Sequence, residues 1–179
     1  MYYLTKYVSP VGVMTLACRG GSLVGLWLEG QKYYGAGLAE PAAEKNDMPV
    51  FAAARDWLDR YFAGERPSAP EFPLAPAGGA FRQTVWDILR GIPYGEVVSY
   101  GGVAKKAAER LNRKSMSSQA IGGAVGHNPI CVIIPCHRVV GADGSLTGYA
   151  GGIRTKVKLL ELEGADMTRL FVPKRGTAL

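Results

Sequence analysis

The sequence contains few cysteines and no long apolar run. Its three cysteines, an odd number at wide spacing in 179 residues, do not make a disulfide framework. A reducing, cytoplasmic environment therefore fits the chain best, because a thiol stays reduced there. No apolar run approaches the roughly 18 residues of a transmembrane helix, and the N-terminus MYYLTKYVSP lacks the charged-then-apolar pattern of a secretion signal. We therefore expect no membrane partner.

Histidine is scarcer still, since the chain has only two, His127 and His137. Acidic residues are scarce in one part of the chain. Residues 79–179 hold 14 Lys and Arg against seven Asp and Glu, whereas residues 1–78 hold seven against eight. This asymmetry favours a polyanionic partner for the second part. A high isoelectric point is common among proteins, so the charge supports such a partner without identifying it.

The first part of the chain predicts a small α/β arrangement. Short apolar stretches, separated by turns that contain glycine and proline, predict strands over Tyr2–Val8, Val13–Cys18 and Leu23–Leu28. Residues 29–48 have the mixed composition of a loop. Apolar residues at helical spacing then predict a helix over Pro49–Phe62, with the proline in its first turn.

Residues 66–79, RPSAPEFPLAPAGG, mark a domain boundary because they contain four prolines and two glycines. The change in charge falls at the same place. We therefore expect an α/β N-terminal domain over residues 1–75 and a mainly α C-terminal domain over residues 79–168.

The second domain has the outline of a helix-turn-helix. We expect one helix that ends near Gly91, a second from about Tyr100 to Leu111, a basic loop, and a third helix that Ser117 caps and that runs to Gly126. Many helix pairs share this outline, so the outline alone is a weak signal. The cations of this region are candidate phosphate contacts, although surface lysines more often are merely solvated: Lys105, Lys106, Arg110, Arg113 and Lys114.

The third of these helices contains three glycines, Gly122, Gly123 and Gly126. An interior glycine costs roughly 1 kcal/mol relative to alanine. Close approach of the helix backbone to another surface would account for that cost. The surface is either another helix of the chain or a narrow nucleic-acid groove.

Three further elements are predicted between Ile130 and Gly164. An apolar run predicts an extended segment over Ile130–Ile134, and two glycines within five residues predict a turn over Gly141–Ser145. Apolar residues at helical spacing predict a last helix from about Ile153 to Leu160, closed by Gly164 as a C-cap.

Two reactive residue types, Cys136 and His137, are immediate neighbours after that extended segment. Neighbouring side chains of an extended segment point in opposite directions, so contact requires a sharp turn at Pro135 or a bridging water. A carboxylate beyond the imidazole would fix its tautomer; the candidates are Asp143, Glu161 and Glu163. The alternative is a buried structural cysteine, as we expect for Cys18 and Cys131. A proline, a histidine and an arginine around Cys136 favour chemistry, because they have no reason to cluster in an apolar strand.

The stretch NPICVIIPCHRVVG, with GSLTGYAGG following, resembles the O6-alkylguanine-DNA alkyltransferases, the methylated-DNA–protein-cysteine methyltransferases. The Pro-Cys-His-Arg-Val core after Asn-Pro is highly specific to that family. The resemblance runs from about Phe81 through Gly164. Residues 1–75 resemble the family's N-terminal α/β domain, which is ribonuclease-H-like, only in strand order and position.

The resemblance implies DNA repair by stoichiometric transfer of an alkyl group from O6 of guanine to Cys136. His137 matches the histidine that acts on this cysteine through a water, Glu163 matches its carboxylate partner, and Asn128 matches the asparagine that braces the turn before the cysteine. The protein reacts once, because the alkyl-cysteine is never hydrolysed. The resemblance implies a monomer that uses no cofactor, nucleotide or otherwise.

The implied partner is double-stranded DNA that contains O6-alkylguanine, with the base flipped out through the minor groove. Tyr100 matches the tyrosine that contacts the target base, Tyr149 matches the pocket wall, and Lys156 matches a lysine near both. Backbone groups of Cys136, Val139 and Ala150 match those that read the guanine edge. The residues that we expect to contact DNA are Ser99, Arg113, Lys114, Gln119, Ala120, Gly122 and Gly123.

The sequence departs from the family pattern at three places that bear on the site. Gln119 stands where the family has an arginine that enters the base stack, Cys131 stands where the pocket often has proline, and Ala150 stands where serine is common. Some relatives hold a structural zinc in the N-terminal domain. We expect no metal here, because residues 1–78 contain no histidine and only Cys18.

Two other functions compete with this interpretation. Alkyltransferase-like proteins recognise alkylguanine without reacting, but they replace the acceptor cysteine that this chain keeps. A cysteine hydrolase would release many product molecules per protein, so turnover would separate it from a protein that reacts once.

Overall fold

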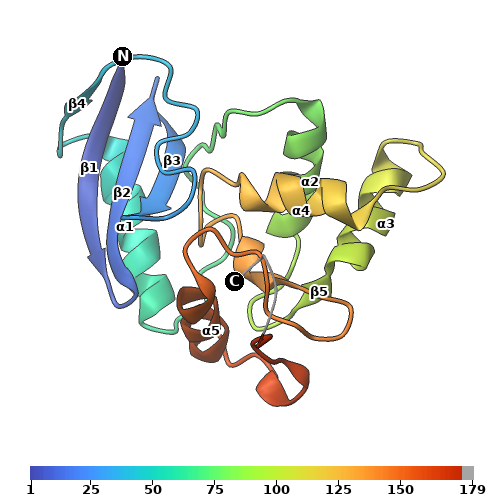
Figure 1. The fold of residues 1–179 in the computed structure, drawn as a ribbon. Helices are drawn as coiled ribbons and strands as arrows, with labels where there is room; N and C mark the ends of the chain where they lie inside the picture. The colour runs from blue at the N-terminus through green and yellow to red at the C-terminus, as the bar shows by residue number, and fades with distance from the viewer. Residues whose placement is uncertain (175–179) are drawn as a thin grey trace. The chain divides into compact units, whose positions relative to one another are not determined.

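The structure is a computed structural model that describes residues 1–174, and the chain divides into two compact units (Figure 1). Unit 1 comprises Met1–Ala77 and Pro129–Ile133, and unit 2 comprises Gly78–Asn128 and the described residues from Ile134 onward. The chain passes from unit 1 to unit 2 inside the stretch rich in proline and glycine. No helix in residues 1–174 combines the length and the apolar character needed to cross a membrane.

Unit 1 is a four-stranded sheet with one helix packed against it (Figure 1). The strands β1 (Tyr2–Ser9), β2 (Gly12–Arg19) and β3 (Ser22–Leu28) are antiparallel neighbours, and α1 spans Pro49–Phe62. The helix buries an apolar stripe that includes Phe51, Leu58 and Tyr61. The three predicted strands and the predicted helix are confirmed, because their apolar spacing matches the faces that the unit buries.

One strand of unit 1 was not predicted. The strand β4 (Ala42–Glu44) pairs parallel to β1, with Tyr2 opposite Ala42, inside the stretch expected to be a loop. All three of its residues are exposed. An exposed edge strand of three residues has no alternation of apolar and polar side chains, so its sequence carries no strand signal.

Pro129–Ile133 lies with unit 1, although the sequence places these residues inside the second domain. The main chain of β3 accounts for this, because the Leu26 amide donates to the Pro129 carbonyl at 2.8 Å and the Cys131 amide donates to the Leu26 carbonyl at 3.0 Å. The two predicted domain ranges, 1–75 and 79–168, treat each domain as continuous and so do not include this return to unit 1.

Unit 2 is built on the helices α2 (Ala80–Arg90), α3 (Tyr100–Arg110) and α4 (Ser118–Gly126). Trp86 of α2 is buried, and its ring nitrogen donates to the Ala124 carbonyl of α4 at 2.9 Å. Residues 111–117 join α3 to α4 as the basic loop of the expected helix-turn-helix. The helices α3 and α4 begin and end within one or two residues of the predicted positions, and α2 ends next to Gly91 as expected.

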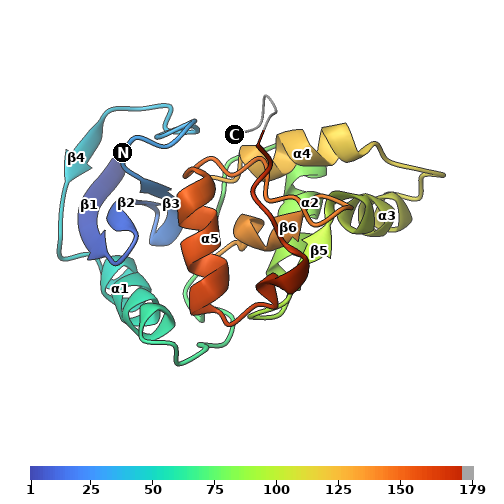
Figure 2. The ribbon, with the colours of Figure 1, turned by 60° about the horizontal axis from the view of Figure 1, so that its bottom comes forward.

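The Pro-Cys-His-Arg motif leads directly into a second layer of unit 2, which is built from a short sheet and a helix. The strands β5 (Val98–Ser99) and β6 (Val139–Val140) pair in parallel, side by side in Figure 2. The helix α5 (Ile153–Leu162) contributes Leu160 to a core cluster that includes Val140 and Leu146. Gly164 follows this helix with φ of +68°, which fits its predicted role at the C-terminal cap. A short 3₁₀ turn, η2 (Met167–Arg169), follows.

The expectation of an extended segment over Ile130–Ile134 is wrong. The Ile133 amide donates to the Cys131 carbonyl at 2.8 Å around Val132, whose φ is +68°. Pro135, with φ −82° and ψ 65°, then centres a second three-residue turn, and the 3₁₀ turn η1 covers Cys136–Arg138. These dihedrals are those of γ-turns, the first of them the rare and strained form. A run of β-branched residues predicts a strand, and only tertiary packing reverses that preference.

We predict that Ser117→Ala lowers the stability of the chain by about 1 kcal/mol, as typical of a lost N-cap. The Ser117 hydroxyl accepts a hydrogen bond from the Ala120 amide at 3.0 Å at the start of α4. Urea denaturation followed by circular dichroism measures the loss. Ser118→Ala is the matched control, because Ser118 lies one residue further on and is exposed. Equal midpoints for the two variants would contradict the cap assignment.

Candidate active site

The two γ-turns place Cys136 at the start of η1. The Asn128 side chain donates to the Ile134 carbonyl at 2.8 Å and thereby ties the end of α4 to the turn before the cysteine. Cys136 is 5% exposed and His137 is fully buried. A sharp turn at Pro135, one of the two arrangements expected to link these neighbours, is present.

The imidazole of His137 is hydrogen-bonded to one carboxylate. Its Nε2 lies 2.6 Å from Oε1 of Glu163, and both side chains are fully buried. A carboxylate only accepts hydrogen bonds, so Nε2 carries the hydrogen and the lone pair of a neutral ring is on Nδ1. The other two candidate carboxylates lie elsewhere: Asp143 accepts from the Ser145 amide in an exposed turn, and Glu161 is exposed.

Two further groups bond the same carboxylate. Arg138 donates through Nε to Oε2 of Glu163 at 2.8 Å and through Nη2 to Oε1 at 2.9 Å. The Gly95 amide donates to Oε2 at 3.1 Å, and Gly95 has φ of +80° with no room for a side chain beside the Glu163 carbonyl. Neither Gly95 nor Arg138 was assigned a role from the sequence, where the arginine served only as a sign that the segment around Cys136 carries chemistry.

Burial and the His137–Glu163 hydrogen bond have opposite effects on the pKa of each of these two residues. Burial alone would raise the pKa of Glu163, but the hydrogen bonds and charges of His137 and Arg138 outweigh it and hold that pKa below its usual range. Burial lowers the pKa of His137 more than Glu163 raises it. The carboxylate is therefore ionised and the imidazole is neutral at pH 7.

Lys156 is a fully buried cation on α5. Its ammonium donates to the Val139 carbonyl at 2.5 Å and to the Thr147 carbonyl at 2.9 Å. Burial lowers the pKa of Lys156 to about 8, whereas a negative charge on Cys136 would raise it. The Tyr100 hydroxyl donates to the same Thr147 carbonyl at 3.0 Å. Lys156 and Tyr100 thus fix one wall of the site through a single carbonyl group.

The thiol of Cys136 is protonated at rest. Burial raises its pKa, and the hydrogen bond from Asn128 and the charge of Lys156 oppose that rise without cancelling it. Burial, and then the charge of a Cys136 thiolate, raise the pKa of Tyr100 to about 12, so its hydroxyl also keeps its proton. Since the thiolate is the nucleophilic form, this site needs a base to remove the proton.

A pocket of about 530 Å³ opens beside this network in unit 2. It lies between the start of α3, the first turns of α4 and the loop before Tyr149, whose ring meets the His137 ring edge-on at 6.5 Å between centroids. Its lining residues are Tyr100, Gly101, Ser118, Gln119, Gly122, Ala142, Thr147 and Gly148. Of the expected substrate-binding residues, Val139 and Tyr149 are buried and Ala150 is half-buried.

The expected DNA contacts lie along one stretch of unit 2. Gln119, Ala120 and Gly123 of α4 and the loop residues Arg113 and Lys114 are exposed. Ser99 caps α3, where its hydroxyl accepts from the Gly102 amide at 3.0 Å. A side-chain carbon built at Gly122 or Gly123 would meet nothing within 4 Å among the described residues. Packing against another helix of the chain therefore does not explain these glycines.

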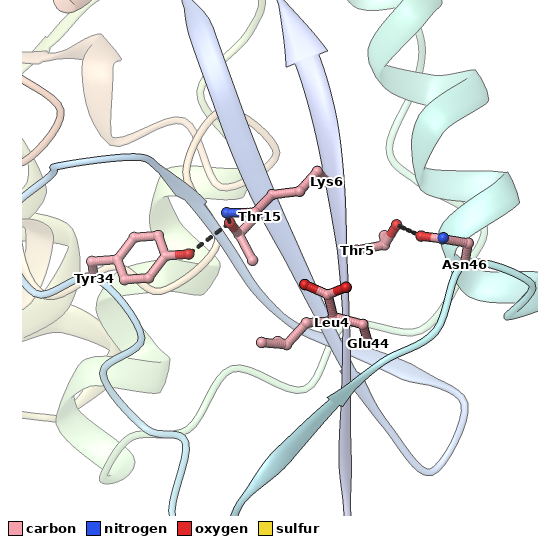
Figure 3. Close-up of a pocket in the computed structure, with 7 residues that line it drawn as sticks. All are labelled: Leu4, Thr5, Lys6, Thr15, Tyr34, Glu44 and Asn46. Atoms are coloured by element: carbon pink, nitrogen blue, oxygen red, sulfur yellow. Dashed lines mark hydrogen bonds between the residues drawn. The ribbon is translucent and has the colours of Figure 1, made fainter.

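A second pocket, of about 330 Å³, lies on the sheet of unit 1 (Figure 3). Its polar side chains bond one another, as the Tyr34 and Thr15 hydroxyls do at 2.7 Å and as Thr5 and Asn46 do. Its lining contains neither a cysteine nor a histidine: Leu4, Thr5, Lys6, Thr15, Tyr34, Glu44 and Asn46. The pocket of unit 2 is instead lined by Tyr100 and Thr147, which belong to the hydrogen-bond network beside Cys136, so the candidate active site is the one in unit 2.

The α-helical unit holds a buried cysteine, histidine and glutamate, which is a site for nucleophilic chemistry at a thiol. Comparison with known proteins identifies the family. A family model described as the DNA-binding domain of 6-O-methylguanine DNA methyltransferase matches residues 80–165, and one described as the ribonuclease-like domain of that protein matches residues 1–76. The chain belongs to the 6-O-methylguanine DNA methyltransferase family. The resemblance inferred from the Pro-Cys-His-Arg motif and the expected fold class are confirmed.

Relatives cover nearly the whole chain. The methylated-DNA–protein-cysteine methyltransferase of Haemophilus influenzae is 43% identical over 162 residues, which is 90% of this chain and 86% of the relative. That of Mycobacterium tuberculosis H37Rv is 44% identical over 166 residues, 89% and 93% of the two chains. A crystal structure of M. tuberculosis OGT in complex with DNA is similar at a TM-score of 0.73, with 41% identity over 90% of this chain and 91% of that one.

We predict that Lys156→Met makes Cys136 less reactive toward iodoacetamide at pH 7 by about tenfold, because a nearby cation lowers a thiol pKa by one unit or more. The effect should shrink above pH 8, where the wild-type ammonium itself loses its charge. Peptide mass spectrometry in a Cys18→Ser, Cys131→Ser background measures labelling of Cys136 alone. Lys158→Met, an exposed position on the same helix, is the control. Equal labelling of both variants would exclude the charge of Lys156 as a stabiliser of the thiolate.

Proposed function

We propose that this protein repairs DNA by transferring a methyl or other alkyl group from O6 of guanine in duplex DNA to its own Cys136, once per molecule. The single observation that carries the proposal is the buried His137–Glu163 hydrogen bond of 2.6 Å next to a buried cysteine. The relatives in H. influenzae and M. tuberculosis support it, because both are named methylated-DNA–protein-cysteine methyltransferases.

The proposed reaction is a direct displacement at the alkyl carbon. The sulfur of Cys136 forms a bond to that carbon while its bond to O6 of guanine breaks. The thiol proton passes through a water to Nδ1 of His137, and guanine gains one proton on release, so the net exchange is one alkyl group for one hydrogen. Glu163 stabilises the imidazolium while it exists. The thioether that remains has no leaving group activated for hydrolysis, so the protein is consumed.

The proposed roles of the other residues follow from their contacts. Asn128 braces the turn that presents Cys136, and Lys156 stabilises the thiolate as it forms. Tyr100 keeps its proton and can donate a hydrogen bond to the base. Tyr149 packs against His137 as a wall of the pocket, and backbone groups of Cys136, Val139 and Ala150 read the guanine edge.

The proposed partner is double-stranded DNA with the target base flipped out through the minor groove. The open space beside Gly122 and Gly123 supports a close approach of α4 to the groove, with Ser99, Ala120, Arg113 and Lys114 as further contacts. The excess of basic residues in 79–179 supports the same partner. The DNA complex of M. tuberculosis OGT is a further support, since that protein is 41% identical.

We also propose that the two domains span residues 1–75 and 79–168, and that the protein acts in the cytoplasm. The three cysteines support this location, because an odd number at wide spacing does not make a disulfide framework. None of the three cysteines, which all lie in the described part of the chain, forms a disulfide bond.

The decisive test is the intact mass of the protein after incubation with a duplex that contains O6-methylguanine. We expect a gain of one methyl group, located at Cys136 by peptide mapping, and never more than one equivalent transferred per protein. Cys136→Ser should abolish transfer and retain DNA binding, whereas Cys18→Ser and Cys131→Ser should both react. Release of more than one equivalent of demethylated guanine per protein would overturn the proposal in favour of a turnover enzyme.

We predict that Gln119 enters the base stack in place of the family's arginine. Gln119 is exposed, lies on the first turn of α4 and lines the pocket. Its planar amide offers a donor and an acceptor to the orphaned cytosine. Gln119→Ala should slow repair of duplex O6-methylguanine by about tenfold or more, because flipping costs a few kcal/mol. Its reaction with free O6-benzylguanine, which needs no flipping, should change little.

Gln119→Arg is the matched variant for this prediction. It should preserve or improve repair of the duplex, since a guanidinium stacks well and donates in several directions. If Gln119→Ala has equal effects on both substrates, or none on either, Gln119 is not the wedge. Arg113, Lys114 or Met116 of the preceding loop would then be the candidates.

A further inference from the structure

Arg138 is a buried cation to which the proposed reaction gives no part. It is 8% exposed and lies directly after His137 in η1. Its guanidinium makes the two bonds to Glu163 described above and a third, through Nη1, to the Ile92 carbonyl at 2.5 Å. All three nitrogen atoms of the guanidinium thus donate hydrogen bonds inside unit 2.

The glutamate accepts four hydrogen bonds as a result. Oε1 accepts from His137 and from Nη2 of Arg138, and Oε2 accepts from Nε of Arg138 and from the Gly95 amide. A paired guanidinium and carboxylate have one preferred planar geometry. The carboxylate therefore cannot rotate away from the imidazole without breaking two bonds to Arg138.

The turn before β5 holds Arg138 from its other side. The guanidinium lies 5.7 Å from the centre of the Tyr94 ring, a cation–π distance, and the Tyr94 hydroxyl donates to the Leu162 carbonyl at 3.3 Å. Ile92, Tyr94 and Gly95 therefore form one support around the pair of Arg138 and Glu163. An arginine at this place joins α5, η1 and the turn before β5.

We propose that Arg138 is a positioning residue that holds Glu163 toward His137 and keeps His137 neutral in mildly acidic solution, so that Cys136 can still be deprotonated there. The inference rests on the proposed function, because it assumes that neutral His137 takes the proton of Cys136. A neutral imidazole is required for that step, since the imidazolium has no lone pair to accept a proton.

The electrostatic reason is the effect of three charged groups, Glu163, Arg138 and Lys156, on the pKa of His137. Burial lowers the pKa of His137, the carboxylate of Glu163 raises it, and the cations Arg138 and Lys156 lower it. The Tyr149 ring faces the imidazole edge-on. Without Arg138, only Lys156 of these two cations would remain to oppose the rise that Glu163 causes in the pKa of His137. The pair of His137 and Glu163 would then take up a proton at a higher pH than in the wild type.

The first test is nuclear magnetic resonance of the histidine rings against pH, which needs no alkyl donor. The chain has two histidines, so comparison with His127→Gln identifies the His137 signals. We expect His137 to become protonated at a pH higher by about one unit or more in Arg138→Met than in the wild type. Arg138→Lys retains the charge and should stay close to the wild type. Arg138→Gln, which keeps one donor for Glu163, replaces the methionine variant where that variant does not fold.

The second test is the rate of reaction with free O6-benzylguanine against pH, because this substrate avoids the pH dependence of DNA binding. We expect the rate of Arg138→Met to fall at a higher pH than that of the wild type. The alkaline side of the profile should be unchanged, because the Arg138 guanidinium bonds Glu163 and the Ile92 carbonyl, whereas the Cys136 thiol responds to Asn128 and Lys156. The double variant Arg138→Met, Glu163→Gln removes both charges and should lose this shift.

Two results would overturn the inference. An unchanged protonation midpoint of His137 in Arg138→Met and Arg138→Gln would remove its electrostatic basis. A rate that falls by one factor at every pH would show that Arg138 only supports the fold. A failure of alkyl transfer in the wild type, with the expected histidine titration, would contradict the proposed function and leave the role of Arg138 at His137 standing.

Discussion

The buried carboxylate of Glu163 is the group on which the rest of the site depends. A carboxylate in a protein interior is stable as an anion only where hydrogen bonds replace those of water. Here four bonds do so, from the imidazole of His137, the guanidinium of Arg138 and the Gly95 amide. Because these donors come from two separate segments, the carboxylate joins the end of α5 to η1 and to the turn before β5. Loss of Glu163 would leave Arg138 buried and unpaired.

Burial shifts the pKa values of Cys136 and His137 in opposite directions. Burial raises the pKa of Cys136 and lowers that of His137, so the resting pair is a thiol and a neutral imidazole. Such a pair is less nucleophilic than a thiolate and an imidazolium, because the thiolate is the nucleophilic form. The charge of Lys156 lowers the pKa of Cys136 without cancelling the effect of burial. A protein that reacts once and is not regenerated benefits from this restraint, because each accidental alkylation would remove one molecule.

Local patterns in the sequence were sufficient for most of the fold. The helix over Pro49–Phe62 and the cap at Ser117 depend on neighbours within one or two turns, so periodicity and capping rules predicted them. The prediction of an extended segment around Val132 was wrong, because packing imposes two γ-turns there that no local pattern encodes. The role of Arg138 escaped prediction for a similar reason. Its partner Glu163 lies 25 residues further along the chain, and nothing in the spacing brings the two together.

The central claim is that Glu163 acts on Cys136 through His137 rather than independently. A double-mutant cycle with His137→Ala and Glu163→Gln tests it most directly, with the single-turnover rate of methyl transfer from duplex O6-methylguanine as the readout. Each single variant should be slow, and the double variant should be about as slow as His137→Ala alone, because residues that act as a unit are not additive. Effects that multiply in the double variant, or a wild-type rate for Glu163→Gln, would contradict the account.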